Sequence, residues 1–165
     1  MKHKNATKFL ISIIICELAG VLGSMSMASE IGMPFGSWYE NLKKPSYNPP
    51  NWLFAPVWTT LYIMMGIAGG LVWHEINSPR KEEVKKAMLF FAIQLGLNAL
   101  WSYLFFGLKN PLLALIEIVL LWLMIYETYI KFSKINKFSG YLFVPYLLWV
   151  SFATVLNASI WWLNR

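Results

Sequence analysis

The chain of 165 residues is 58% hydrophobic and only 13% charged, a composition that excludes an ordinary soluble domain and is typical of a membrane protein. The formal net charge of +6 does not indicate nucleic-acid binding, because the basic residues lie between apolar runs rather than along one stripe. A single cysteine, Cys16, excludes an intramolecular disulfide and a thiol pair that could hold a metal ion.

Five apolar stretches are long enough to cross the hydrocarbon core of a bilayer, which takes about 20 helical residues. They predict membrane-spanning helices at approximately 8–29, 52–73, 84–107, 112–132 and 138–162. Pro56 and Pro111 suit the first turns of the second and fourth spans, and Pro145 is expected to kink the fifth span or free a carbonyl there. The whole chain, residues 1–165, is therefore predicted to be one all-α membrane domain. It is a bundle of five transmembrane helices with a long Pro/Trp-rich loop between helices 1 and 2.

Basic residues are divided unevenly between the two ends of the predicted bundle. Ten lie at the amino terminus and in the second and fourth loops, namely Lys2, Lys4, Lys8, Arg80, Lys81, Lys85, Lys86, Lys131, Lys134 and Lys137. Four lie at the opposite end, namely Lys43, Lys44, Lys109 and Arg165. Because lysine and arginine concentrate in cytoplasmic loops, the amino terminus is predicted to be cytoplasmic and the carboxyl terminus to lie outside.

The first span has a second interpretation. A basic start, an apolar core and the sequence Ser26-Met27-Ala28 as a cleavage site together describe a secretory signal peptide. Ile15 ahead of Cys16 argues against lipoprotein processing, which requires a small residue at that position. A cleaved chain would retain four spans.

The segment from Trp38 to Trp58, which reads WYENLKKPSYNPPNWLFAPVW, concentrates aromatic residues and prolines. Prolines hold a loop in one shape at low entropic cost, and tryptophan and tyrosine offer large flat surfaces with one polar group each. This combination favours an ordered lid over a ligand site. The alternative is an ordinary belt of aromatic residues at the membrane interface.

Polar residues of the third span lie on one helical face. Gln94, Asn98 and Ser102 follow at four-residue steps, and Trp101 and Phe105 flank them. Such residues either line a cavity or hydrogen-bond one helix to another. The two interpretations are balanced for Gln94, whereas the flanking aromatic residues favour a pocket role for Asn98.

The second and fifth spans have comparable faces, which combine aromatic side chains with small or amide residues. The residues are Trp58, Tyr62, Met65, Gly66 and Gly69 in the second span, and Tyr146, Trp149, Ala153 and Asn157 in the fifth. Three such faces predict a flat hydrophobic slot with a few hydrogen-bonding groups.

Two glutamates, Glu17 and Glu117, lie well inside spans, where a carboxyl must be paired or neutral. Structural hydrogen bonding is favoured over proton-coupled transport, because the spans lack a basic partner to complete a relay. The small-residue steps from Gly20 to Ser24 and from Gly66 to Gly70 permit close helix approach, within one bundle or in a homodimer.

Motifs for catalysis or metal binding are absent from the sequence, which has no CxxCH, no histidine pair at metal spacing, no phosphate loop and no nucleophile elbow. His74 stands alone at the end of the second span. It is predicted to be an interfacial residue, with a haem-ligand role as the alternative.

Three separated motifs resemble the TspO/MBR family of translocator and tryptophan-rich sensory proteins. They are WYENLKKPSYNPPNWLFAPVW, NALWSYLFF from Asn98 and PYLLWVSFATVLN from Pro145, and the similarity extends over nearly the whole chain. The resemblance implies five transmembrane helices, a homodimer and a porphyrin ligand such as protoporphyrin IX. Some members of this family also bind cholesterol and synthetic drugs.

The resemblance also implies a ligand pocket. Carried over by motif, the pocket residues are Tyr39, Trp58, Asn98, Trp101, Ser102, Trp149 and Ala153. In some bacterial relatives, degradation of porphyrin by light and oxygen has been attributed to tryptophans that match Trp58 and Trp149. Such chemistry needs no general base, which agrees with the lack of catalytic motifs.

The end of the chain departs from the pattern of animal members, which carry a tyrosine-centred cholesterol motif. Residues 158–165 contain no tyrosine, so cholesterol binding is not expected. The sequence therefore predicts a membrane protein that binds a porphyrin and acts as a sensor, carrier or scavenger. No cofactor is required, and Lys43 and Lys44 either attract the propionates of the ligand or form a solvated surface pair. The alternatives are a porphyrin-degrading enzyme that uses Trp58 and Trp149, and a proton-coupled transporter that uses Glu17 or Glu117.

Overall fold

A computed structural model describes residues 2–28 and 38–165, and every regular element in these residues is helical. The long helices are α1 (Lys2–Ala28), α3 (Phe54–His74), α4 (Lys81–Ser102), α5 (Pro111–Ile135) and α7 (Val144–Leu163). Short helical turns lie between them: α2 (Trp38–Asn41), η1 (Asn51–Leu53), η2 (Glu75–Asn77), η3 (Tyr103–Gly107) and α6 (Lys137–Tyr141).

Five helical segments are long and apolar enough to cross a membrane. They are Thr7–Met27, Asn51–Asn77, Lys81–Gly107, Pro111–Ile135 and Lys137–Leu163. The predicted all-α fold with five spans is therefore confirmed. The predicted loop between the first two spans includes residues 29–37, which lie outside the described part of the chain.

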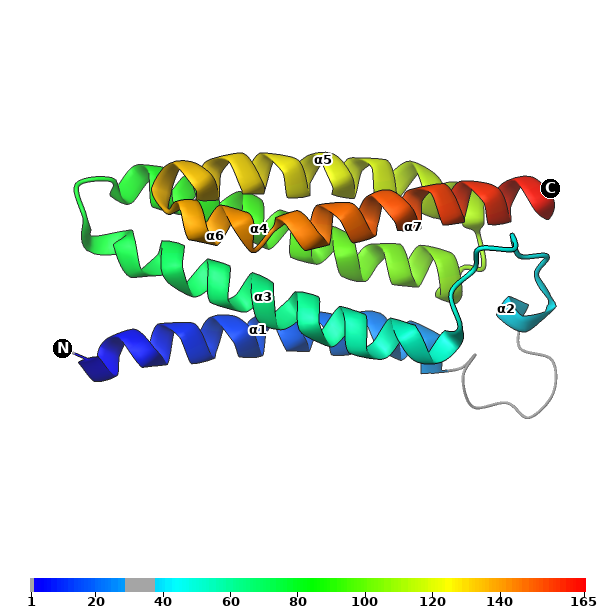
Figure 1. The fold of residues 1–165 in the computed structure, drawn as a ribbon, viewed down its shortest axis with the longest axis horizontal. Coiled ribbons are helices and arrows are strands. Elements are labelled where there is room, and N and C mark those ends of the chain that lie inside the picture. The colour runs from blue at the N-terminus through cyan, green and yellow to red at the C-terminus, as the bar shows by residue number, and fades with distance from the viewer. Residues whose placement is uncertain (1, 29–37) are drawn as a thin grey trace.

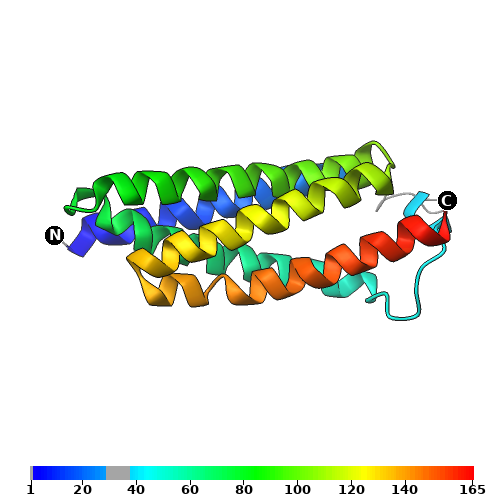
Figure 2. The same cartoon turned by 90° about the horizontal axis from the view of Figure 1, so that it is seen from above.

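The long helices run side by side, each antiparallel to the next in the sequence, with the amino and carboxyl termini at opposite ends of the bundle (Figures 1 and 2). Helix α1 packs on α3 and α4, α4 packs on α5, and α5 packs on α7. Helix α3 meets the fifth span through α6, whereas its direct contact with α7 is slight. In Figure 1, α3 and α7 diverge toward the carboxyl-terminal end of the bundle.

Glycines on α3 allow α1 to approach closely. A Cβ atom added at Gly66 would overlap the backbone of Ile13, and one at Gly70 would come within 2.7 Å of the Phe9 ring. The small-residue step from Gly66 to Gly70 therefore serves packing inside the bundle, a choice that the sequence left open.

Prolines lie at the starts of two helices, which was predicted for Pro111 but not for Pro145. Pro111 begins α5, and the Asn110 side chain caps this helix by accepting a hydrogen bond from the Leu113 amide at 3.1 Å. Pro145 interrupts the fifth span, because the chain leaves α6 at Tyr141 and starts α7 at Val144. The fifth span is thus two helices in sequence rather than one kinked helix.

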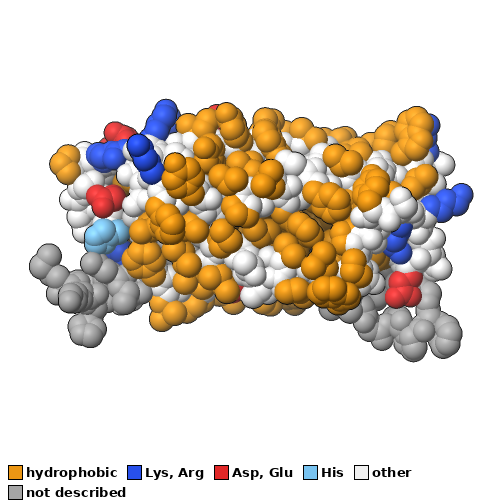
Figure 3. Space-filling view, viewed as in Figure 1, with side chains coloured by type: hydrophobic (Ala, Val, Ile, Leu, Met, Phe, Trp, Pro, Cys, Tyr) orange, Lys and Arg blue, Asp and Glu red, His pale blue; other side chains and the backbone are white. Residues whose placement is uncertain are grey.

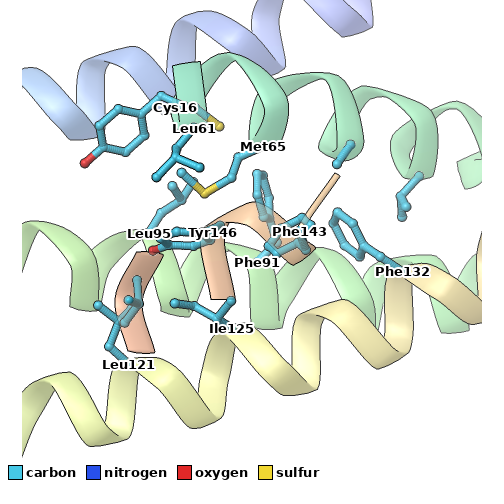
Figure 4. Packing of buried hydrophobic residues seen from close by; sticks show 14 of the residues in the cluster. Cys16, Leu61, Met65, Phe91, Leu95, Leu121, Ile125, Phe132, Phe143 and Tyr146 are labelled. Atoms are coloured by element: carbon cyan, nitrogen blue, oxygen red, sulfur yellow. The ribbon is translucent and has the colours of Figure 1, made fainter. Parts of the chain in front are cut away.

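The main hydrophobic core lies in the middle of the bundle (Figure 4). Cys16, Met65, Leu95, Ile125 and Tyr146 come from the five long helices and meet there. The face seen in Figure 3 carries a broad apolar band, with charged side chains gathered mainly at its two ends. This distribution is the one that a bilayer requires of a spanning bundle.

Candidate functional site

A groove of about 700 Å³ runs between α3 and α7 and opens on the side of the bundle. Its lining is almost entirely apolar and comes from η1, α3 and α7: Trp52, Leu53, Pro56, Val57, Thr60, Leu61, Met64, Pro145, Leu148, Trp149 and Phe152. The Thr60 hydroxyl already donates to the Pro56 carbonyl at 2.8 Å. The groove therefore offers flat apolar surface and little polarity of its own.

Trp149 is the one predicted pocket residue that lines this groove. Its ring meets Phe54 edge-on, with centroids 6.1 Å apart, and lies 5.7 Å from the Phe152 ring at a tilt of 40°. Two aromatic neighbours thus pack against the indole at the wall of the groove.

A chain of hydrogen bonds crosses the bundle behind the groove. The Tyr62 hydroxyl on α3 donates to the Asn98 carbonyl oxygen on α4, and the Asn98 amide donates to the Tyr146 hydroxyl on α7 at 2.9 Å. All three side chains are buried, and Asn98 is only 4% exposed. One amide thus joins three spans, as expected where water is absent.

Trp58 lies against this chain rather than in the groove. Its ring stacks on Tyr62 at 5.5 Å with an interplanar angle of 28°, and meets Tyr146 edge-on at 6.1 Å. Its neighbours Val57 and Leu61 line the groove, so Trp58 forms a layer directly behind the wall.

A second aromatic cluster joins the carboxyl-terminal end of the bundle to α2. The Trp101 ring stacks on Phe105 at 5.2 Å, and its indole N–H donates to Asn157 at 3.1 Å. The Tyr39 ring packs on Phe105 and Phe106, with centroids 6.2 and 5.6 Å apart.

The Tyr39 hydroxyl donates to the Asn48 side-chain oxygen at 3.3 Å. Burial raises the pKa of the Tyr39 phenol above its ordinary value, and the hydrogen bond with Asn48 partly opposes this shift. The phenol therefore keeps its proton, and its donor role, at neutral pH.

Comparison with known proteins adds independent evidence to this architecture. The sequence model of the TspO/MBR family matches residues 12–163. This chain belongs to the TspO/MBR family. The match extends from within the first span to the end of the fifth, so the chain is an integral, multi-pass membrane protein of the TspO type.

The chain is also similar to individual curated proteins. The chain is 44% identical to the tryptophan-rich protein TspO of Chlorobaculum tepidum, over 98% of this chain and 99% of the relative. It is 39% identical to protein CrtK of Rhodobacter capsulatus, over 97% and 94% of the two chains. It is also 35% identical to the translocator protein of Sus scrofa, over 90% and 85%.

The remaining pocket residues expected from the TspO/MBR resemblance lie elsewhere. Ser102 faces α1, where a Cβ atom added at Gly23 would be 3.2 Å from its hydroxyl oxygen. Ala153 is half-buried and packs against the main core. The structure therefore places the seven predicted residues in neighbouring groups, and the rings of Tyr62, Tyr146 and Phe105 fill the space between them.

Sequence reasoning placed Tyr62 and Tyr146 on the correct helical faces but did not choose them as site residues. The signal was their position one helical turn or less from Trp58 and Trp149. Sequence reasoning also did not assign Pro56 and Pro145, which line the groove, to a ligand site. A proline in a span frees backbone and prevents close packing, which is a physical reason for a groove there.

One of the two buried acids, Glu117, does not form the hydrogen bond expected of it. Glu117 is 5% exposed, and within the described residues neither of its carboxyl oxygens has a hydrogen-bonding partner. The predicted structural hydrogen bond of Glu117 is therefore wrong. Two further side-chain oxygens are buried without a hydrogen-bonding partner among the described residues: one carboxyl oxygen of Glu17 and the amide oxygen of Gln94.

Proposed function

We propose that this TspO/MBR protein binds a porphyrin, or a related flat hydrophobic tetrapyrrole, in the groove between α3 and α7 and acts as a sensor, carrier or scavenger. The observation that carries the proposal is the apolar groove of about 700 Å³ with the Trp149 indole in its wall. Pockets for organic ligands typically occupy about 300–1,000 Å³ and have apolar, aromatic walls.

The open side of the groove suits a ligand that partitions into lipid. The macrocycle stacks on Trp149 and is enclosed by Phe152 and Met64, which replaces its contact with lipid by contact with aromatic and polarisable side chains. Trp58 acts from behind the wall, because its contacts with Tyr62 and Tyr146 hold α3 and α7 at a fixed separation.

The polar edge of the ligand points to the carboxyl-terminal end, where basic side chains lie. The Lys44 ammonium already donates to the Glu40 carbonyl at 3.3 Å and lies 4.5 Å from the centre of the Tyr39 ring. Lys43 is exposed, and its side chain attracts a propionate at the mouth of the groove.

The test is a titration of the purified protein with protoporphyrin IX, followed by porphyrin absorbance. Trp149→Phe removes part of the stacking surface and weakens binding roughly tenfold, whereas Trp58→Phe weakens it less. Trp162→Phe is the matched control, because Trp162 is exposed and lies outside the groove. Unchanged affinity in a Trp58→Phe, Trp149→Phe double variant excludes the groove as the binding site.

Light-driven porphyrin degradation is a second candidate, because an indole in contact with an excited macrocycle is positioned to donate an electron. Illumination of the purified complex in air tests it. A new absorbing product that requires Trp149 or Trp58 supports degradation, and bleaching at the rate of free porphyrin rejects it.

A further inference from the structure

Three lysines from two helices converge on one glutamate at the end of the bundle that carries the amino terminus. The beginning of α4 and the end of α5 lie side by side there (Figures 1 and 2). Glu127 on α5 pairs with Lys131 at 2.9 Å. It also interacts electrostatically with Lys134 of α5 and with Lys86 of α4. These four residues, called the lysine cluster here, have a formal net charge of +2.

Arg80 holds the two helix ends of the lysine cluster together. Its guanidinium donates to the Lys134 carbonyl at 2.5 Å and to the Ile135 carbonyl at 3.4 Å, in the last turn of α5. The same guanidinium pairs with Glu83 in the first turn of α4 at 3.1 Å. Because these contacts tie the start of α4 to the end of α5, the lysines of both helices are held on one surface.

Two of the three lysines have no close partner. Lys131 neutralises Glu127, and its ammonium lies 4.3 Å from the centre of the Phe90 ring on α4, a cation–π contact that holds this side chain between the two helices. Lys86 and Lys134 are exposed, and within the described residues neither ammonium forms a salt bridge or a hydrogen bond. The cluster therefore presents two available cations to an anion.

The lysine cluster lies at the depth of the lipid headgroups. Lys86 is within two turns of the start of α4 at Lys81, and Lys131 is within two turns of the end of α5 at Ile135. At the rise of an α-helix, both positions are within about 8 Å of the helix ends. The polar region on each side of a bilayer is about 5–8 Å deep. Flexible lysine side chains at this depth reach the phosphates of the lipids.

Below the lysine cluster, α4 and α5 expose an apolar strip. On α4, Phe90 and Ile93 follow Lys86 on one helical face, and on α5, Leu120 and Leu123 precede the glutamate of the cluster. Ile93, Leu120 and Leu123 are all exposed large hydrophobic residues. A charged end above an apolar strip matches the two parts of a phospholipid, its headgroup and its acyl chain.

We propose that the lysine cluster binds the headgroup of an anionic phospholipid, with an acyl chain of the same lipid along the apolar strip. A lipid with a net negative charge complements the net charge of +2, whereas a zwitterionic lipid brings a cation to the same lysines. Membrane topology requires only that lysines are numerous at one end. Their convergence from two helices is the further feature that a headgroup site explains. No residue of the cluster lines the α3–α7 groove, so this site does not depend on the proposed function.

Lipid binding is measured by native mass spectrometry of the delipidated full chain in detergent, titrated with phosphatidylglycerol or phosphatidylcholine. One phosphatidylglycerol binds more tightly than phosphatidylcholine, and the Lys86→Gln, Lys134→Gln double variant weakens its binding by roughly fivefold per lysine replaced. The matched control is Lys85→Gln, Lys137→Gln, which removes the same charge from exposed lysines outside the cluster at the same end. Equal affinity for the two lipids overturns the proposal, and so does an equal loss in the two double variants.

Glu127→Gln changes the affinity in the opposite direction. It removes the carboxylate and frees Lys131, so phosphatidylglycerol binds roughly fivefold more tightly, while phosphatidylcholine binding changes little. Because a gain of affinity cannot result from misfolding, this variant separates the charge of the cluster from its contribution to stability. Added salt weakens the binding of phosphatidylglycerol by screening. Unchanged or weaker binding of phosphatidylglycerol to Glu127→Gln overturns the proposal.

Competition with inorganic phosphate separates a lipid site from a site for a soluble anion. A phospholipid is held by its headgroup and by its acyl chain, so inorganic phosphate does not displace phosphatidylglycerol beyond the effect of sodium chloride at the same ionic strength. Displacement by phosphate beyond that effect would assign the lysine cluster to a soluble anion and would overturn the lipid proposal.

Discussion

The Asn98 amide on α4 donates to the Tyr146 hydroxyl on α7 at 2.9 Å, so two spans that are separated in the sequence by α5 are joined at the centre of the bundle. Tyr62 on α3 completes the connection by donating to the same asparagine. The groove wall formed by α3 and α7 therefore depends on one polar residue of a third helix.

Replacement of Asn98 by leucine is expected to destabilise the bundle. Two buried phenols lose their partner, and the free energy of unfolding falls by about 1–3 kcal/mol. Thermal unfolding in detergent measures the effect. Tyr62→Phe and Tyr146→Phe each remove one bond and cost less, and Asn77→Ala at an exposed position is the control. A neutral Asn98→Leu variant contradicts the assigned network.

The buried carboxyl of Glu117 is expected to lower the free energy of unfolding. Its carboxyl is buried without a partner in the described residues, so Glu117→Leu raises the free energy of unfolding by about 1–3 kcal/mol. Glu127→Gln is the comparison, because Glu127 is paired with Lys131 at 2.9 Å and its replacement lowers stability slightly. A marked loss of stability in Glu117→Leu would reveal a partner that the structure does not contain. The same variant removes the acid that a proton-coupled transporter requires.

Replacement by alanine is expected to change stability in opposite directions at two helical glycines. Gly66→Ala brings a methyl group into the Ile13 backbone and lowers stability by at least about 1 kcal/mol. Gly96 has no atom within 4 Å of an added Cβ, so Gly96→Ala raises stability by about 0.5–1 kcal/mol through helix propensity. Chemical denaturation of both variants checks the sign. A destabilising Gly96→Ala would mean that this face of α4 is covered, for example by a second copy.

The orientation predicted from charge is open to a direct measurement. Ser46→Cys, in the segment between α2 and η1, is expected to react with an impermeant thiol reagent added outside intact cells. Asn77→Cys at the opposite end is expected to react only after lysis. The native Cys16 is buried and gives a low background. The reverse pattern would place the segment between α2 and η1 in the cytoplasm.

The fold was largely predictable from the sequence. In a bilayer, the length of each apolar run and the positions of prolines largely determine where helices begin and end. Pro111 correctly located a helix start, whereas Pro145 was expected to kink the fifth span and instead lies where a new helix begins. The spans differ from expectation mainly at their ends. The close packing of α1 on Gly66 required coordinates, because a small-residue step fits a neighbour in the bundle and a second copy equally well.

The site was less predictable from the sequence. Helical faces correctly placed Trp58 and Asn98 inside the bundle, but periodicity does not say which interior residues face a groove and which fill the core. The Tyr62 and Tyr146 rings lie between Trp58 and Asn98, and Trp149 lines the groove without Trp58. The hydrogen bond between Lys43 and Asn164 joins residues more than a hundred positions apart, so no local sequence pattern predicts it.

The central claim is that a porphyrin binds between α3 and α7 on Trp149. The most direct measurement is an experimental structure of this protein with protoporphyrin IX bound. We predict the macrocycle against Trp149 and Phe152, with its propionates toward Lys43. A macrocycle bound instead at the smaller hollow of about 280 Å³ between α5 and α7, beside Trp122, would contradict the claim.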